Sequence, residues 1–322
     1  MRIFIYVLFT LVPFLSLAQE SNNEKNPQNE LIIIPSHPAQ GFHNSYILFI
    51  PSGVSKNELT NLLVEPNNTG KLSDSISVHE QYAIHLASVS SIGNNIATEL
   101  NIPLLVPIFS RPASKPLMYA HALDRDVVLE PSMELKRLDL QLLAMIRDAK
   151  KQLALRDILV RDKIFMNGFS ASATFTNRFL FIHPEIVEAA AMGGFNGELM
   201  LPLKKYENQK LNYPLGVHDF KLLFGNQFDQ KTYAKIPQHI YMGALDANDA
   251  VQFEDAYSLE ERQIINSALG DNVQDRYVKC QGIYVQNNIS AVFQTYPEVG
   301  HWTTSKMNLD TILFFLNISK NQ

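Results

Sequence analysis

Short apolar runs that alternate with longer amphipathic segments constrain the fold of this chain most strongly. The apolar runs have the length of buried strands, and they cover residues 31–34, 46–50, 104–109, 163–167, 187–192, 239–242 and 291–296. They show little alternation of apolar and polar residues, as a sheet covered on both faces requires. Segments with helical spacing lie between them. The pattern therefore predicts an α/β fold, a mostly parallel central sheet with helices on both faces.

The composition is that of a globular protein. Hydrophobic residues make up 46% of the 322 residues and charged residues 18%, which excludes a disordered or fibrous chain. A formal net charge of −5 gives no reason to expect nucleic acid or an anionic membrane as a partner. The sequence contains neither an HExxH zinc motif nor a glycine-rich phosphate loop, so a metal or dinucleotide site has no support.

The N-terminus has the features of a signal peptide. Met1-Arg2 is a short basic start, residues 3–17 are almost wholly apolar, and Ser16-Leu17-Ala18 fits the small-x-small cleavage rule. This apolar run is shorter than the ~20 residues that a membrane-spanning helix needs. We expect a cleaved signal peptide over 1–18, a disordered polar leader over 19–30 and one domain over 31–322. The mature protein would be secreted or periplasmic, without stable membrane insertion; the alternative is an uncleaved anchor.

The segment 167–172 reads NGFSAS and is a candidate nucleophile elbow centred on Ser170. It follows a predicted strand and opens a predicted helix, which is the context that such a motif needs. The positions two before and two after the serine must be small, because strand and helix approach each other closely there. Gly168 meets this condition fully, and Ser172 is small enough to meet it. Ser170 is therefore the predicted nucleophile.

The partners of a serine nucleophile follow in the chain order acid, then histidine. His301 comes after the last predicted strand and would take the Ser170 proton as general base. Asp246 stands three residues after Gly243, which ends a strand, and is the predicted acid of the triad. Asp249 is the alternative acid, although its position before a helical segment also suits an N-cap.

Negative charge on a tetrahedral intermediate needs two backbone N–H donors. One is expected from Ala171, directly after the nucleophile at a helix N-terminus. The other is expected from the loop that follows strand 46–50, with Gly53 or Val54 as the donor. Tyr119 and His121 follow a strand whose end faces the predicted site and are candidates for substrate binding; a hydrogen-bonded loop histidine is the alternative reading of His121.

Residues 201–237 fit no simple strand–helix unit. This segment follows the strand that ends at Gly193 and is rich in Phe and Tyr. Because ligands bind at the carboxyl ends of strands in open α/β sheets, we expect it to be a cap-like insertion over the site. Ordinary aromatic packing is the alternative.

Several segments together resemble the α/β-hydrolases of the polyhydroxybutyrate-depolymerase-like and esterase-like kind. They are NGFSAS at 167–172, HPE at 183–185, AAMGG at 190–194, MGALD at 242–246 and GH at 300–301. The resemblance covers roughly residues 45–316. It departs from the common pattern at Ser172, which replaces a glycine, and in lacking a His-Gly start to the oxyanion loop.

The resemblance implies a serine hydrolase that cleaves small-molecule or polymeric carboxylic esters through an acyl-enzyme, with no metal or organic cofactor. Two alternatives stay open. An exported peptidase of the same fold would use the same triad on amides, and a binding protein on a hydrolase scaffold would use none of it.

Overall fold

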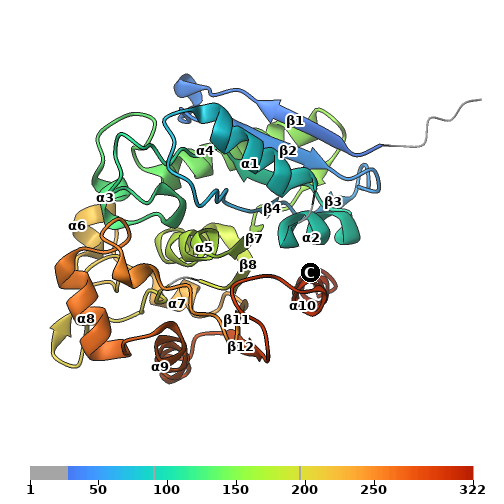
Figure 1. Ribbon diagram of the computed structural model, residues 1–322. Helices are drawn as coiled ribbons and strands as arrows, with labels where there is room; N and C mark the ends of the chain where they lie inside the picture. The colour runs from blue at the N-terminus through green and yellow to red at the C-terminus, as the bar shows by residue number, and fades with distance from the viewer. Residues whose placement is uncertain (1–27, 90, 196, 322) are drawn as a thin grey trace, which may run out of the picture.

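The computed structural model describes residues 28–321 except 90 and 196. Its centre is an eight-stranded sheet in the order β1-β2-β5-β4-β7-β8-β11-β12, and Figure 1 labels all of these strands except β5. β1 pairs antiparallel with β2, and β2 antiparallel with β5, whereas the strands from β5 to β12 are parallel. The predicted mostly parallel sheet is confirmed. Its strands are β1 (Glu30–Ile34), β2 (Tyr46–Ile50), β4 (Leu63–Val64), β5 (Leu104–Pro107), β7 (Ile164–Phe169), β8 (Val187–Gly193), β11 (Gln238–Gly243) and β12 (Ala291–Tyr296).

Helices cover both faces of this sheet. The first face packs on α1 (Ile76–Ser88), α2 (Ile92–Leu100) and α10 (Ser305–Ser319), and the second on α4 (Leu138–Ala154), α5 (Ala171–Ile182) and α9 (Val273–Gln286). Neighbouring residues of β7 show the division: Phe165 belongs to the first core and Met166 to the second, and both are fully buried. Burial on both faces is the reason why the strands read as continuous apolar runs.

Shorter elements complete the described part of the chain, and none of its helices is long and apolar enough to cross a bilayer. The predicted signal peptide (1–18) and nearly all of the leader (19–30) lie outside the described residues. The remaining helices are α3 (Arg125–Leu129), α6 (Phe220–Phe224), α7 (Gln230–Tyr233) and α8 (Leu259–Leu269), with 3-10 turns η1 (Pro38–Gln40), η2 (Ala120–Ala122), η3 (Pro184–Ile186) and η4 (Ala250–Gln252). Two small ladders pair β3 (Leu59–Thr60) with β6 (Leu159–Val160), and β9 (Lys205–Tyr206) with β10 (Gln209–Lys210).

The aromatic side chains of the 201–237 segment pack on one another and on α5. The Phe181 ring of α5 lies 5.0 Å from the Phe228 ring and 4.1 Å from the Tyr233 ring, measured between centroids. Phe220 in turn contacts Phe228 and Phe224. These rings extend the core on the second face of the sheet.

Candidate active site

Ser170 lies on a tight turn between β7 and α5. Its φ is 63°, a left-handed conformation that costs an L-residue energy, and its N–H donates to the Gly193 carbonyl oxygen at 2.9 Å. A Cβ on Gly168 would lie 2.3 Å from the Ser172 carbonyl oxygen, so only glycine fits there. The Ser172 hydroxyl accepts from the Phe169 N–H and donates to the Phe169 carbonyl oxygen. The local structure is the strand, sharp turn and helix that the motif predicts.

His301 lies between Ser170 and Asp246. Its Nε2 is 2.9 Å from the Ser170 Oγ, and its Nδ1 is 2.9 and 3.1 Å from the two carboxylate oxygens of Asp246. Asp246 is 2% exposed, whereas the His301 side chain is 27% exposed. A neutral imidazole that donates from Nδ1 to the carboxylate leaves Nε2 free to accept the serine proton.

Hydrogen bonds hold the turn that carries Asp246 against α9 and against the loop of His301. The Gln274 side chain of α9 donates to the carbonyl oxygens of Gly243 and Asp246 at 3.0 and 2.8 Å. The Leu245 N–H donates to the Val299 carbonyl oxygen at 2.8 Å, which joins this turn to the loop of the histidine. The acid and the base are therefore held together by backbone contacts as well as by their own hydrogen bond.

Asp249 occupies a different environment from Asp246. Its carboxylate accepts from the Arg276 guanidinium at 2.7 Å and from the Val251 N–H at 2.9 Å, at the start of η4. The buried Arg276 and the helix cap give Asp249 a structural function. Of the two candidate acids, it is Asp246 that pairs with His301.

Asn248 is a member of the site that the sequence did not reveal. Its N–H donates to Asp246 Oδ1 at 2.9 Å, and its Nδ2 lies 3.2 Å from His301 Nε2. No known spacing marks an asparagine two residues after a triad acid; the only signal is the polar run 246–249. Asn248 contacts both partners of the nucleophile and lies in the wall of the hollow beside it.

A hollow of about 440 Å³ opens beside Ser170. Its wall combines donors, acceptors and aromatic rings. The lining residues are Asn68, Gly70, Arg111, Tyr119, Ser170, Asn248, Ala250, Phe253, Asp255 and His301. None of them comes from 201–237, so the expectation that this insertion covers the site is not met. Its aromatic side chains are used in packing against α5 instead.

The expected oxyanion donor at Gly53 is wrong. Strand β2, which precedes Gly53, runs antiparallel to β5, so its carboxyl end lies at the edge of the sheet opposite to Ser170. A Cβ on Gly53 would meet the side chain of Asn101, which caps the end of α2 before β5 begins. Val54, the other expected donor, follows the same strand and lies at the same opposite edge of the sheet. The loop that reaches the hollow is the one after β4, through Asn68 and Gly70.

The two candidate substrate-binding residues have separate positions. Tyr119 lines the hollow, with the Arg111 guanidinium carbon 3.9 Å from the centroid of its ring. His121 is fully buried and is absent from the lining. Its Nε2 lies 2.9 Å from the Phe109 carbonyl oxygen, and burial lowers the pKa of His121 to about 3. The ring is therefore a neutral structural group, and the alternative reading of a hydrogen-bonded loop histidine holds.

Buried His121 instead supports the loop after β4. Its Nε2 is 3.3 Å from the Asn67 side-chain amide, whose nitrogen and oxygen also bond the Phe109 carbonyl oxygen and N–H at 2.9 and 3.0 Å. Asn67 is fully buried, so these contacts fix the start of the loop that continues to Asn68. Asn67 and Asn68 are the first two residues of an Asn-x-Thr sequon, but no catalytic motif in the sequence marks either of them.

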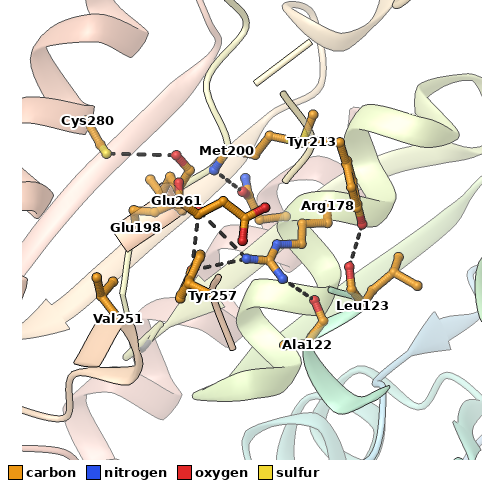
Figure 2. Close-up of polar contacts among 12 residues, drawn as sticks. Ala122, Leu123, Arg178, Glu198, Met200, Tyr213, Val251, Tyr257, Glu261 and Cys280 are labelled. Carbon is orange, nitrogen blue, oxygen red and sulfur yellow. Dashed lines mark hydrogen bonds and ion pairs between the residues drawn. The ribbon is translucent and has the colours of Figure 1, made fainter. Parts of the chain in front are cut away.

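A buried arginine ties the walls of the hollow to the nucleophile helix. Arg178 of α5 donates to the Ala122 carbonyl oxygen of η2 and to the Tyr257 hydroxyl, each at 3.0 Å (Figure 2). Glu198 lies 3.7 Å from the guanidinium and accepts from the Tyr257 hydroxyl at 3.3 Å. Arg178 and Glu198 are 1% and 2% exposed. Burial raises the pKa of Glu198 to about 7, against the lowering effect of Arg178.

No group of three or more His, Cys, Asp or Glu side chains among the described residues is arranged to hold a metal ion. The polar side chains that line the hollow are instead those of Ser170, His301, Asn68, Asn248, Tyr119, Arg111 and Asp255. This set can transfer a proton and polarise a carbonyl group.

Comparisons with solved structures find the same architecture. A poly(aspartic acid) hydrolase from Sphingomonas sp. KT-1 aligns with a TM-score of 0.56 at 16% sequence identity, covering 90% of this chain and 98% of the other. A poly(3-hydroxybutyrate) depolymerase from Bordetella parapertussis also gives a TM-score of 0.56, at 13% identity and 90% coverage of both chains. No family model matches the sequence, and no curated protein does.

Proposed function

We propose that this chain, which has the α/β-hydrolase fold, is a serine hydrolase that cleaves carboxylic esters. The observation that carries the proposal is the contact series from Ser170 Oγ through His301 Nε2 and Nδ1 to the Asp246 carboxylate. The series lies in the wall of a hollow that is large enough for a small ester. Both solved structures named above are hydrolases, which supports the class of reaction.

The contacts define the order of proton transfers. Ser170 Oγ attacks the ester carbonyl carbon while its proton passes to His301 Nε2, and the Asp246 carboxylate stabilises the imidazolium. The tetrahedral intermediate then expels the alcohol oxygen, which takes the proton from Nε2 and leaves an acyl group on Ser170. Water attacks this acyl-enzyme by the same route, with His301 accepting the proton of water and returning it to Ser170 Oγ.

Two backbone N–H groups would stabilise the oxyanion. Ala171 is the first residue of α5, where the helix leaves its N–H groups without intrahelical partners and the dipole favours negative charge. The second donor is assigned to the loop after β4, at Asn68, because that loop lines the hollow and its start is fixed through Asn67. In parallel α/β sheets this edge is where ligands bind.

Export of the mature chain is a further part of the proposal. It rests on the apolar run and small-x-small site of residues 1–18 alone. A secreted or periplasmic location follows if that segment is cleaved. Comparison of the N-terminal residue of the protein from whole cells and from the extracytoplasmic fraction tests it, with Gln19 as the expected new terminus.

Hydrolysis of a panel of nitrophenyl esters and peptide anilides tests the activity. We expect turnover of short-chain esters, and Ser170→Ala should lower kcat by up to ~10⁶-fold without a change in melting temperature, because the half-exposed Oγ fills no core space. Cleavage of anilides in preference to esters would assign the site to a peptidase. Activity in Ser170→Ala above a tenth of the wild-type value would remove Ser170 as nucleophile.

A further inference from the structure

An ion pair lies in the wall of the hollow, outside the triad. Arg111 follows β5 and Asp255 follows η4, and the guanidinium Nη2 donates to Asp255 Oδ2. Both residues line the same hollow as Ser170. The Arg111 side chain is 9% exposed and the Asp255 side chain 21% exposed, so the pair is largely withdrawn from water. Charged side chains are rarely held in this way without further partners.

The pair has hydrogen-bonding capacity to spare. Within the described residues, Nη2 is the only guanidinium nitrogen of Arg111 with a hydrogen bond, and Oδ2 is the only Asp255 oxygen with one. The guanidinium carbon of Arg111 lies 3.9 Å from the centroid of the Tyr119 ring, a cation–π contact that helps to hold the guanidinium in place. Arg111 Nε is buried without a partner, so the donors that the hollow offers are those of the two terminal guanidinium nitrogens, beside an acceptor from Asp255.

A hydroxyl group matches this arrangement better than a carboxylate or an apolar group. It can accept from the guanidinium and donate to the carboxylate at once. A substrate carboxylate would lie against the Asp255 carboxylate in the same wall, and the two like charges would repel each other. An apolar group would bury the pair without replacing its hydration, which is unfavourable.

Aromatic rings flank the pair. Tyr119 makes a cation–π contact with Arg111, and Phe253 is 62% exposed in the same wall. A large exposed aromatic ring beside a polar pair offers an apolar surface to the carbon skeleton of a ligand. Alternating hydroxyl groups and C–H surface are the chemistry of a polyol.

The hydrogen bonds of Arg178 hold the two segments that flank the Arg111–Asp255 pair. Arg178 bonds η2, which follows Tyr119 directly, and also Tyr257, two residues after Asp255 (Figure 2). Because Arg178 is buried on α5, behind the nucleophile, it fixes the distance between these walls and Ser170. A preorganised site loses less entropy when it binds.

From these observations we propose that Arg111 and Asp255 form a subsite for an uncharged, polyhydroxylated part of the ester substrate. This inference rests on the proposed function, because the subsite selects among esters that Ser170 attacks. Arg111 and Asp255 would bind the hydroxyl groups, and Tyr119 and Phe253 would contact the carbon skeleton between them.

Two matched esters test the subsite. Glyceryl monoacetate carries two free hydroxyl groups, and its dimethoxy counterpart carries the same acetyl ester with both hydroxyls methylated. The quantity measured is the ratio of their kcat/KM values, followed by acid release in the wild type and in Asp255→Ala. We expect the wild type to favour the diol by about tenfold or more, because the methylated ester leaves the Asp255 acceptor unpaired. In Asp255→Ala the ratio should fall to near one.

A substitution that damages the site lowers kcat/KM for both esters alike and leaves their ratio unchanged. A change in the ratio therefore reports recognition of the hydroxyl groups. Asp271→Ala, which removes the same charge at an exposed position outside the hollow, should keep the wild-type ratio. Equal rates on the two esters in the wild type, or an unchanged preference in Asp255→Ala, would overturn the subsite. A monoester of succinate turned over faster than the diol would assign it to carboxylates and also overturn it.

Nitrophenyl acetate, which has no hydroxyl group, reports on the proposed function separately. If the wild type hydrolyses nitrophenyl acetate and Ser170→Ala does not, the proposal of a serine hydrolase stands, even when the wild type shows no preference for the diol. If the wild type hydrolyses none of these esters, both proposals fail.

Discussion

Ser170 is held at a positive φ by contacts on both sides of its turn. Its N–H is bonded to β8, and Gly168 leaves no space for a side chain where α5 begins. Strain of this kind persists only where the surroundings enforce it, and it tends to mark functional positions. The strained backbone presents Oγ to His301 instead of burying it in the sheet.

Asparagine at each of the two acidic positions separates catalysis from stability. Asp246→Asn keeps the shape of the turn but cannot hold the imidazole tautomer, so kcat should fall by up to ~10⁴-fold with little change in melting temperature. Asp249→Asn removes the charge that pairs with buried Arg276, so we expect activity to remain and stability to fall by roughly 3 kcal/mol. Measurement of kcat and Tm for both variants checks this, and an inactive Asp249→Asn with an active Asp246→Asn would reverse the assignment.

At the scale of residues, the sequence identified positions with a motif or a chain order and missed those without one. Ser170 stands in a recognisable turn, and Asp246 and His301 follow strand ends in the expected order; the structure brings these three together. Arg111 and Asp255 lie 144 residues apart, and nothing local announces that they meet. Such pairs depend on how loops fold over the sheet edge, which single-sequence patterns do not encode.

At the scale of elements, the central strand that the sequence does not predict is β4. β4 has only two residues, yet it lies in the middle of the sheet between β5 and β7. Two residues form no recognisable apolar run, so the sequence predicts the oxyanion loop after β2 instead. The direction of β2 could not be read either, because an apolar run is the same whether its strand is parallel or antiparallel. The 201–237 segment lies between β8 and β11, and its aromatic content does not distinguish a cover over the site from ordinary packing.

The contacts between α5, η2 and the segment around Tyr257 lead to a prediction for pH. The Glu198 pKa rises from 4.5 to about 7 because of burial, so the folded state binds the proton more tightly than the unfolded chain. The stability that this adds is complete below about pH 4.5 and is lost as the pH rises through about 7. Glu198→Gln mimics the protonated side chain at every pH.

We therefore expect the Tm of Glu198→Gln, relative to wild type, to increase between pH 5 and pH 8. Glu65 and Asp124, whose pKa values burial also raises to about 7, are present in both proteins and cancel in the difference. The exposed Glu260→Gln is the control and should follow the wild type at each pH. A Tm difference for Glu198→Gln that stays constant or shrinks with rising pH would contradict the assignment of this carboxyl as a buried, protonated partner of Tyr257.

At the scale of the whole molecule, the alternation of apolar runs and helical segments was sufficient for the fold. Most strands lie where the runs predicted them, and burial on both faces explains their composition. The order of the strands in the sheet was not available from the sequence, because it depends on how the crossovers pass over the two faces. The fold places the ends of β4, β7, β11 and β12 on one edge, and the triad and the hollow are built from the loops at that edge.

Labelling with a fluorophosphonate tests the central claim most directly. This reagent rapidly phosphonylates a serine hydroxyl that a neighbouring histidine activates, and it leaves ordinary serines unmodified. The account predicts one adduct per chain, mapped by peptide mass spectrometry to the peptide that contains Ser170. Labelling should be slowed strongly in His301→Ala and absent in Ser170→Ala, with both variants folded. A folded wild-type protein that remains unlabelled, or one labelled at another serine with Ser170 unmodified, would contradict the claim that Ser170, His301 and Asp246 form a working catalytic triad.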